Sequence, residues 1–235
     1  MVIDNETKVI AFRVDASLTI GTGHVTRCLT LANMLSEHGV KSHFVCRAHT
    51  GHMAEKIKEY GYNVLLLPLL HEGKKETNNS DQSKYASWLG ATLINDANET
   101  IQYLKEINPI WLVVDHFAID ARWEIKIKAE TALKIMIIDG LADRKHECDL
   151  LLDQTYSQEG NERWVNMVPE NCKLIVGPKY ALLRPEFLSA YRNLRQRNTK
   201  VKRILIAFGG IDDPNATFKT LEAMGKLNRI DIKID

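Results

Sequence analysis

The sequence predicts an α/β protein in which a Rossmann-like domain with a parallel sheet is followed by the start of a second α/β domain. Short apolar runs alternate with amphipathic helical segments along most of the chain, which is typical of a parallel sheet covered by helices. A glycine-rich turn joins the first run to the first helix, and a basic stretch at 195–203 precedes a further strand and helix. We therefore expect a first domain at 1–198, which includes a linker, and an incomplete second domain at 199–235.

The expected strands are apolar runs bounded by glycine, proline or polar residues. They cover residues 9–14, 40–46, 63–67, 111–114, 134–138, 150–152, 174–176 and 202–207. The expected helices have apolar positions at helical spacing, and they cover residues 25–38, 53–60, 96–108, 120–133, 185–195 and 215–226. Gly39, Gly61 and Pro109 end the first three helices. Asp96 and Glu99 have the spacing of a capping box, so the third helix is expected to begin at Asp96.

Two polar stretches are expected to lie outside these elements. Residues 72–81 carry lysines and asparagines without an apolar side chain, which indicates a solvated loop. The stretch 195–203 is strongly basic but lacks aromatic residues, so a solvated linker is favoured over a phosphate or nucleic-acid contact.

The composition excludes several classes of protein. Lysine plus arginine (31) nearly balance aspartate plus glutamate (30), so the broad basic field of a nucleic-acid or membrane-surface binder is absent and a small-molecule partner is expected. No apolar window approaches the ~20 residues of a membrane span and the N-terminus does not resemble a signal peptide, so we expect a cytoplasmic protein. The four cysteines have no CxxC spacing, which disfavours a zinc site or a disulfide framework. The oligomeric state stays open.

The turn between the first strand and the first helix has the features of an anion-binding site. Gly21, Thr22 and Gly23 allow a tight turn, and unpaired amides at the start of a helix suit a phosphate or diphosphate. A dinucleotide fingerprint would need glycine and an acidic residue where the chain has Thr26 and Arg47. No cluster has the ligand spacing of a metal site either, so neither a cofactor nor a metal is expected.

His24 follows this turn directly and is the candidate catalytic base. In the first turn of a helix the dipole disfavours the imidazolium, so the ring stays neutral and can take a proton from water. Asp15 and Ser17, at the end of the first strand, are candidates to orient the ring or a sugar. The segments that end further strands are rich in polar residues, are expected at the same rim of the sheet and favour a pocket there. Their residues are Asp115, His116, Phe117, Asp139, Gly140, Asp143, Arg144, Asp153 and Gln154.

Six segments together are similar to one enzyme family. They are RVDAS at 13–17, IGTGHVTRCL at 20–29, VDHFAIDARW at 114–123, IDGLADR at 138–144, GPKYALLRP at 177–185 and FGGIDDPN at 208–215. These segments resemble the UDP-2,4-diacetamido-2,4,6-trideoxy-β-L-altropyranose hydrolases of pseudaminic acid synthesis, and the last one resembles the phosphate loop of that family's second domain. The likeness covers essentially the whole chain.

The resemblance implies a two-domain GT-B fold with the substrate in the cleft. In this family water replaces UDP at the anomeric carbon, with inversion and without a metal, and the catalytic histidine of the GxGH motif corresponds to His24. The implied small-molecule partner is a UDP-sugar. The residues expected to contact it come from both domains and are Asp15, Ser17, Gly21, Thr22, Gly23, Arg27, Asp115, His116, Phe117, Gly209, Gly210 and Asp212.

Two departures from the family pattern bear on the function. Gly140 stands where the family usually has a second aspartate, and the chain ends at Asp235, so the segments expected to hold the uracil and ribose are missing. Two other functions stay open. One is a sugar transferase of the same fold, in which a sugar acceptor replaces water, and the other is a non-catalytic remnant that only binds.

Overall fold

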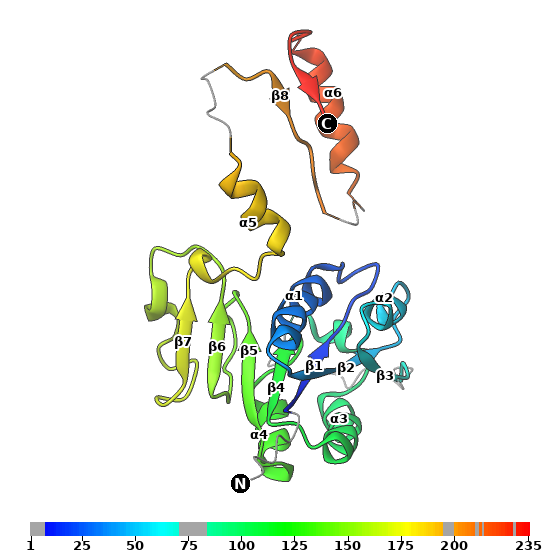
Figure 1. Cartoon of the computed structure of the whole chain (residues 1–235), viewed down its shortest axis with the longest axis vertical. Coiled ribbons are helices and arrows are strands. Elements are labelled where there is room, and N and C mark those ends of the chain that lie inside the picture. Colours follow the sequence, from blue (N-terminus) through cyan, green and yellow to red (C-terminus); the bar gives the residue numbers. More distant parts are fainter. Residues whose placement is uncertain (1–7, 71–83, 195–199, 210–211, 213, 228) are drawn as a thin grey trace. The chain divides into compact units, whose positions relative to one another are not determined.

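The computed structural model describes residues 8–70, 84–194, 200–209, 212, 214–227 and 229–235 (Figure 1). The chain forms two compact units, Met1–Leu183 and Arg184–Asp235, and each is described by itself. The helix that begins at Pro185 belongs to the second of these compact units. The boundary between functional domains at residue 198 remains our prediction.

Unit 1 is built on one parallel sheet of seven strands. The strands are β1 (Val9–Val14), β2 (Lys41–Arg47), β3 (Asn63–Leu67), β4 (Trp111–Asp115), β5 (Lys134–Ile138), β6 (Leu150–Asp153) and β7 (Lys173–Val176). Their order is β3-β2-β1-β4-β5-β6-β7, so the direction of winding reverses between β1 and β4. In sheets of this type, ligands bind at this switch point, beyond the carboxyl ends of the strands.

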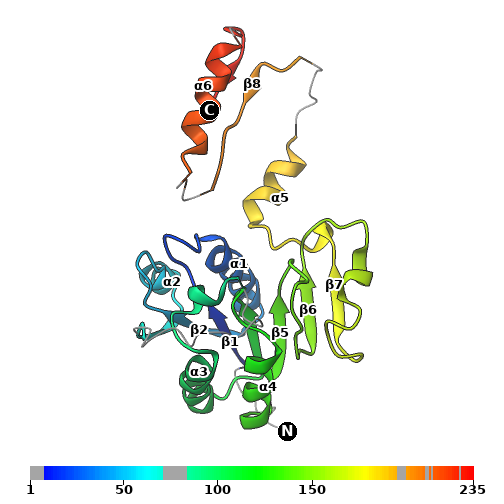
Figure 2. The same ribbon diagram turned by 180° about the vertical axis from the view of Figure 1, so that it is seen from behind.

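Helices cover both faces of the sheet, as the two opposite views in Figures 1 and 2 show. They are α1 (Gly23–Glu37), α2 (Ala54–Glu59), α3 (Leu93–Ile107) and α4 (Ala121–Glu130), with short 3₁₀ helices η1 (Ala86–Leu89), η2 (Gly160–Trp164) and η3 (Pro178–Tyr180). One apolar core contains side chains of β1 with those of α1 and α2, and a second contains side chains of β4 and β5 with those of α3 and α4. The predicted α/β class with a Rossmann-like parallel sheet is confirmed.

The predicted start of the third helix is wrong. The helix α3 begins at Leu93, where the Thr92 hydroxyl accepts a hydrogen bond from the Asn95 amide. Asp96 is fully buried in the first turn and binds Arg13 instead of capping the helix. Sequence spacing cannot separate these two roles, because an aspartate near a helix start suits both a cap and a buried ion pair.

Other differences concern the ends of elements. The helix α4 ends at Glu130, three residues before the predicted end, and the strand predicted at 202–207 is only two residues long. The loop predicted at 72–81 and most of the linker predicted at 195–203 lie outside the described residues.

Unit 2 contains α5 (Pro185–Arg192), β8 (Arg203–Ile204), α6 (Ala216–Lys226) and β9 (Lys233–Ile234). The two strands pair in parallel, as in the opening of an α/β domain. Among the residues that the structure describes in this unit, none is buried. Several large apolar side chains are exposed there, including Leu205, Phe208, Phe218 and Leu221.

No helix within the described ranges combines the length and apolar content needed to cross a membrane.

Candidate functional site

The turn that leads from β1 into α1 is held by Ser17. Its Oγ accepts hydrogen bonds from the amides of Thr19 (3.1 Å) and Ile20 (2.8 Å), and its carbonyl accepts one from the Gly21 amide (2.8 Å). Gly21 has φ +81°, a conformation that favours glycine. Thr22 precedes α1 without a side-chain hydrogen bond to the helix, and the first turn of α1 contains no acidic residue. The turn therefore leaves the amides at the start of α1 available to an anion.

His24 lies in the first turn of α1 with 9% of its surface exposed. Its Nδ1 is 2.6 Å from Oδ1 of Asp115, the fully buried last residue of β4. Burial raises the pKa of Asp115, but hydrogen bonds from Arg27 and the nearby His24 outweigh this effect and lower it to about 2. An ionised carboxylate only accepts hydrogen bonds, so Nδ1 carries the proton and the lone pair of the neutral ring is on Nε2.

Arg27 holds the same carboxylate from the next turn of α1. Its Nε donates to Oδ2 of Asp115 and its Nη2 donates to Oδ1, both at 2.5 Å. The side chain of Arg27 is 27% exposed. Arg27 was expected at the substrate, and the structure places its donor groups on Asp115, where they fix the carboxylate in two directions.

Three partly exposed aromatic side chains form a cluster that contacts the His24 ring through Phe117 and Trp88. The ring of Phe117 packs edge-on against it at 4.7 Å between centroids, and Trp88 lies 6.5 Å away. Tyr85 joins the cluster at 5.3 Å from Phe117 and 4.6 Å from Trp88. The sequence analysis singled out Phe117 but missed Tyr85 and Trp88. In the sequence, Tyr85 and Trp88 are marked only by their place soon after the polar stretch 72–81. This position does not indicate a site unless the fold is known.

Asp15 lies in a buried network of charged groups. It accepts hydrogen bonds from Nη1 of Arg13 and from the backbone amide of Arg47, both at 2.7 Å. Both arginines also bind Asp96, and all four side chains are fully buried. Burial raises the pKa of Asp15, but the Arg13 charge outweighs it and holds this pKa well below its usual range. Asp15 therefore ties together the ends of β1 and β2.

His116 belongs to the same buried network. Its Nδ1 accepts a hydrogen bond from the Ala118 amide, so Nε2 carries the proton in the neutral ring. This Nε2 lies 3.1 Å from Oδ2 of Asp15. Burial lowers the pKa of His116. The side chains of Asp15 and His116, both expected near the sugar, are at most 2% exposed.

Asp139, which follows β5, and Asp153, the last residue of β6, hold loops together. Asp139 pairs with Arg144 at 2.5 Å, and the Arg144 guanidinium lies 5.9 Å from the Phe117 ring centroid. Asp153 accepts a hydrogen bond from the Trp164 indole at 3.0 Å. These contacts fix the loops at the carboxyl ends of β5 and β6.

In unit 2, the segment before α6 contains three predicted substrate contacts. Gly209 has φ +84°, and Gly210 lies outside the described residues. The carboxylate of Asp212 accepts hydrogen bonds from the amides of Ala216 and Thr217, both at 2.7 Å, so it occupies the N-terminus of α6. A diphosphate held by this segment remains a prediction.

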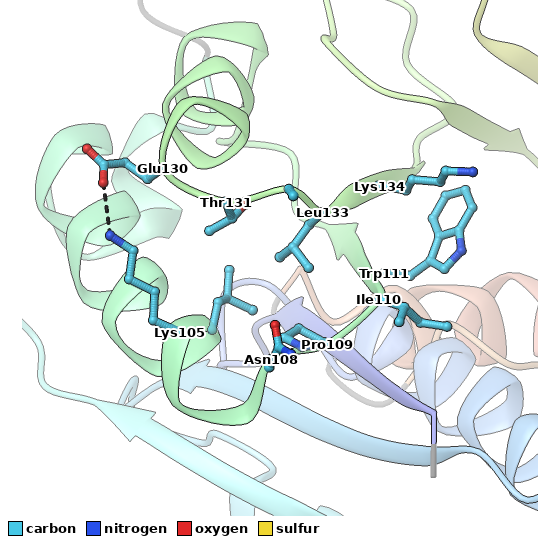
Figure 3. A pocket seen from close by; sticks show the side chains of 11 residues that line it. Lys105, Asn108, Pro109, Ile110, Trp111, Glu130, Thr131, Leu133 and Lys134 are labelled. Carbon is cyan, nitrogen blue, oxygen red and sulfur yellow. Dashed lines mark hydrogen bonds and ion pairs between the residues drawn. The ribbon is translucent and has the colours of Figure 1, made fainter. Parts of the chain in front are cut away.

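A hollow of about 620 Å³ lies at the amino ends of β4 and β5 (Figure 3). His24, in contrast, follows the carboxyl end of β1. The hollow is bounded by the ends of α3 and α4 and the starts of β4 and β5, where Lys105 and Glu130 form an exposed ion pair at 2.9 Å. Parallel sheets bind ligands at the carboxyl ends of their strands, so we assign the site to the edge that carries His24. Within the described residues, no group of three or more histidine, cysteine or acidic side chains could hold a metal ion.

Comparison with known proteins identifies two relatives in sequence. The chain is 28% identical over 95% of its length to the UDP-2,4-diacetamido-2,4,6-trideoxy-β-L-altropyranose hydrolase of Campylobacter jejuni. It is 27% identical over 92% of its length to an uncharacterized protein of Methanocaldococcus jannaschii. The chain spans 68% of the Campylobacter protein and 39% of the archaeal one. No protein-family model matches the chain.

Solved structures establish the fold. A glycosyltransferase from Rickettsia africae matches 98% of the chain with a TM-score of 0.52 at 13% identity, and the match covers 68% of that protein. MurG of Acinetobacter baumannii matches 85% of the chain with a TM-score of 0.50 at 11% identity, and the match covers 52% of that protein. The chain is therefore a GT-B-like α/β protein whose sequence resembles that of a UDP-2,4-diacetamido-2,4,6-trideoxy-β-L-altropyranose hydrolase.

Proposed function

We propose that this chain forms the sugar-binding and catalytic part of an enzyme that hydrolyses UDP-2,4-diacetamido-2,4,6-trideoxy-β-L-altropyranose in pseudaminic acid biosynthesis. The observation that carries the proposal is the His24–Asp115 pair, which joins the start of α1 to the end of β4 at the switch point of the sheet. The similarity to the Campylobacter hydrolase supports the choice of substrate. The proposal includes a cytoplasmic location and a UDP-sugar as the small-molecule partner.

In the proposed reaction, Nε2 of His24 takes a proton from water while the water oxygen attacks the anomeric carbon. The bond from that carbon to the diphosphate oxygen breaks, and UDP leaves with the electron pair from the opposite face, which inverts the configuration. Asp115 stabilises the imidazolium that forms and fixes the orientation of the ring. A general base of this kind contributes about 10²–10⁴-fold to the rate.

The leaving diphosphate is proposed to bind at the N-terminus of α1. The amides of this turn face no side-chain cap, and the helix dipole favours negative charge there. Preorganised amides of this type stabilise developing negative charge without a metal ion.

The aromatic side chains beside His24 fit the proposed sugar. Tyr85, Trp88 and Phe117 present partly exposed rings next to the base. A trideoxy sugar with two acetamido groups has more apolar surface than an ordinary hexose, and aromatic rings bury such surface well.

The test is an assay of UDP release and of the free sugar, carried out with this chain and with a version extended at its C-terminus to a complete second α/β domain. We expect the extended version to release both products in water, with and without EDTA, and His24→Asn to lower the rate of release at least about 100-fold. UDP release that needs a sugar acceptor would instead indicate a glycosyltransferase. Release abolished by EDTA and restored by magnesium would contradict the metal-independent mechanism, and binding without turnover would indicate a non-catalytic protein.

A further inference from the structure

Two cysteines that are distant in the sequence meet at the starts of neighbouring strands. Cys148 precedes β6 and Cys172 precedes β7, and the amide of Lys173 donates to the carbonyl of Asp149 at 2.9 Å, which fixes the two strands beside each other. The Sγ atoms of Cys148 and Cys172 are 3.6 Å apart. Neighbouring strands lie about 4.8 Å apart, which is within the range of Cα separations that a disulfide bridges.

The two thiols differ in their access to solvent. Cys148 is 1% exposed, whereas Cys172 is partly exposed. The hydrogen bond between the two thiols lowers the pKa of Cys172 and, together with burial, raises the pKa of Cys148. The charges of Lys128 and His146 also lower the pKa of Cys172, against burial and Asp149. An accessible thiol of lowered pKa attacks an external disulfide, and a buried neighbour can then resolve the adduct.

The other two cysteines lack this arrangement. Cys28 and Cys46 are at most 2% exposed, and burial raises the pKa of both thiols. The Cys28 thiol also lies 3.6 Å from Oδ2 of Asp115 and donates to it. The chain therefore contains inert thiols that serve as internal controls for the pair.

We propose that Cys148 and Cys172 form a modification site that reacts with low-molecular-weight disulfides and closes to an intramolecular disulfide. The Cys172 thiolate attacks one sulfur of the small disulfide, which forms a mixed disulfide and expels one small thiolate. The Cys148 thiol then loses its proton and attacks Sγ of Cys172, which forms the protein disulfide and expels the second thiolate. Two protein thiols are oxidised, and one small disulfide is reduced to two small thiols.

The site lies at the amino ends of β6 and β7, whereas His24 follows the carboxyl end of β1. The proposal is therefore independent of the proposed hydrolase activity. A disulfide that links these strands restricts the unfolded chain, so the oxidised protein should melt about 5–10 °C above the reduced protein.

The test treats the reduced chain with excess oxidised glutathione under native conditions and follows intact mass, linked peptides and thermal melting. We expect the loss of two hydrogens, one peptide pair that joins Cys148 to Cys172, and the higher melting temperature. Cys148→Ser should stop at a glutathione adduct on Cys172, because the resolving thiol is gone. Cys172→Ser should react at least about tenfold more slowly. The matched control Cys46→Ala should behave like the parent.

Alkylation of the parent chain with iodoacetamide supplies a measurement that needs no variant. Cys172 should be alkylated first under native conditions, and all four cysteines should react in urea. Linked peptides that join other cysteines would overturn the proposal. So would a native chain that stays reduced in oxidised glutathione, a Cys148→Ser variant without an adduct, or equal native alkylation rates at all four cysteines.

Discussion

The imidazole Nδ1 of His24 lies 2.6 Å from the carboxylate Oδ1 of Asp115, a residue 91 positions away in the sequence. The two residues meet because β1 and β4 are neighbours in the sheet, with Val14 in register with Asp115. The turn after β1 then brings the first residues of α1 back over the end of β4. The sheet topology thus creates a histidine–carboxylate pair that neither motif contains alone.

His24→Asn should lower the rate of UDP release by the extended version about 100-fold or more, because the variant lacks the proposed base. The fold should be retained, since the side chain lies at the rim and not in an apolar core. Steady-state UDP release and thermal melting measure the two effects. His38→Asn is the matched control, because His38 is an exposed histidine at the other end of α1. Activity of His24→Asn within about tenfold of the parent would exclude His24 as the base.

Asp115→Asn should reduce the acid dependence of stability. The pKa of Asp115 in the folded protein is about 2, below the ordinary value of 3.8. The carboxylate therefore contributes stability that is complete above pH 3.8 and is lost as the pH falls through 2. This difference corresponds to about 2 kcal/mol.

Urea unfolding of the parent and of Asp115→Asn between pH 5 and pH 2 would measure this contribution as the difference between the two proteins. Other buried carboxylates titrate in both proteins, so their contributions to the pH dependence of unfolding cancel when the two proteins are compared. Glu130→Gln is the control, since Glu130 forms an exposed ion pair. A pH dependence of Asp115→Asn equal to that of the parent would show that folding does not lower the pKa of Asp115.

Asp96→Ala should destabilise the protein by about 3–5 kcal/mol, because it leaves two buried guanidinium groups without this partner. Asp96 accepts hydrogen bonds from Arg13, Arg47 and the indole of Trp123. Thr92→Ala, which removes the observed cap of α3, should cost only about 1 kcal/mol. Urea unfolding of both variants measures the two roles: a loss of only about 1 kcal/mol at Asp96 with no loss at Thr92 would contradict both the buried ion pairs of Asp96 and the cap at Thr92.

Gly140→Ala should destabilise unit 1 by about 1–3 kcal/mol, since a Cβ at this position overpacks the loop. That Cβ would lie 2.5 Å from Cγ2 of Thr155 and 3.2 Å from Oδ1 of Asp153. The side chain of Thr155 thus fills the space that an aspartate at position 140 would need. Thr155→Ser removes the methyl group, so the double variant should recover more than half of the loss in thermal melting. Equal melting temperatures of Gly140→Ala and the parent would contradict this packing.

The fold could be predicted to a large extent from local patterns. Buried parallel strands such as β4 appear in the sequence as short apolar runs, and glycines such as Gly39 and Gly61 mark where helices end. Polar residues at strand ends also predicted that several of them share one rim of the sheet, and the structure brings His24 and Asp115 together there. These features depend on neighbours in the sequence, and the sequence displays them directly.

The partners within the site could not be predicted in this way. Asp15 and Asp115 both end neighbouring strands, yet Asp15 faces Arg13 in the buried network and Asp115 faces His24. The difference arises from tertiary contacts between segments far apart in the chain. Tyr85 and Trp88 were missed for the same reason, because their only relation to His24 is spatial.

The last prediction concerns unit 2. Residues 1–235 should bind UDP at least about tenfold more weakly than the extended version, because donors that must be ordered on binding contribute less than preorganised ones. None of the described residues of unit 2 is buried, and apolar side chains such as Phe218 and Leu221 on α6 are exposed. Within this unit, residues 199–235 fall below the ~40 residues under which a segment rarely folds alone without disulfides or metals, since it buries too little apolar surface to offset its conformational entropy. The elements added in the extended version should cover the apolar side chains of α6 and thereby order the segment around Gly209. The candidate site at His24, in contrast, lies within unit 1. Isothermal titration of both proteins with UDP, together with hydrogen exchange of α6, measures the two effects: equal affinities and equal protection of α6 would show that unit 2 is already ordered and that the nucleotide does not depend on further elements.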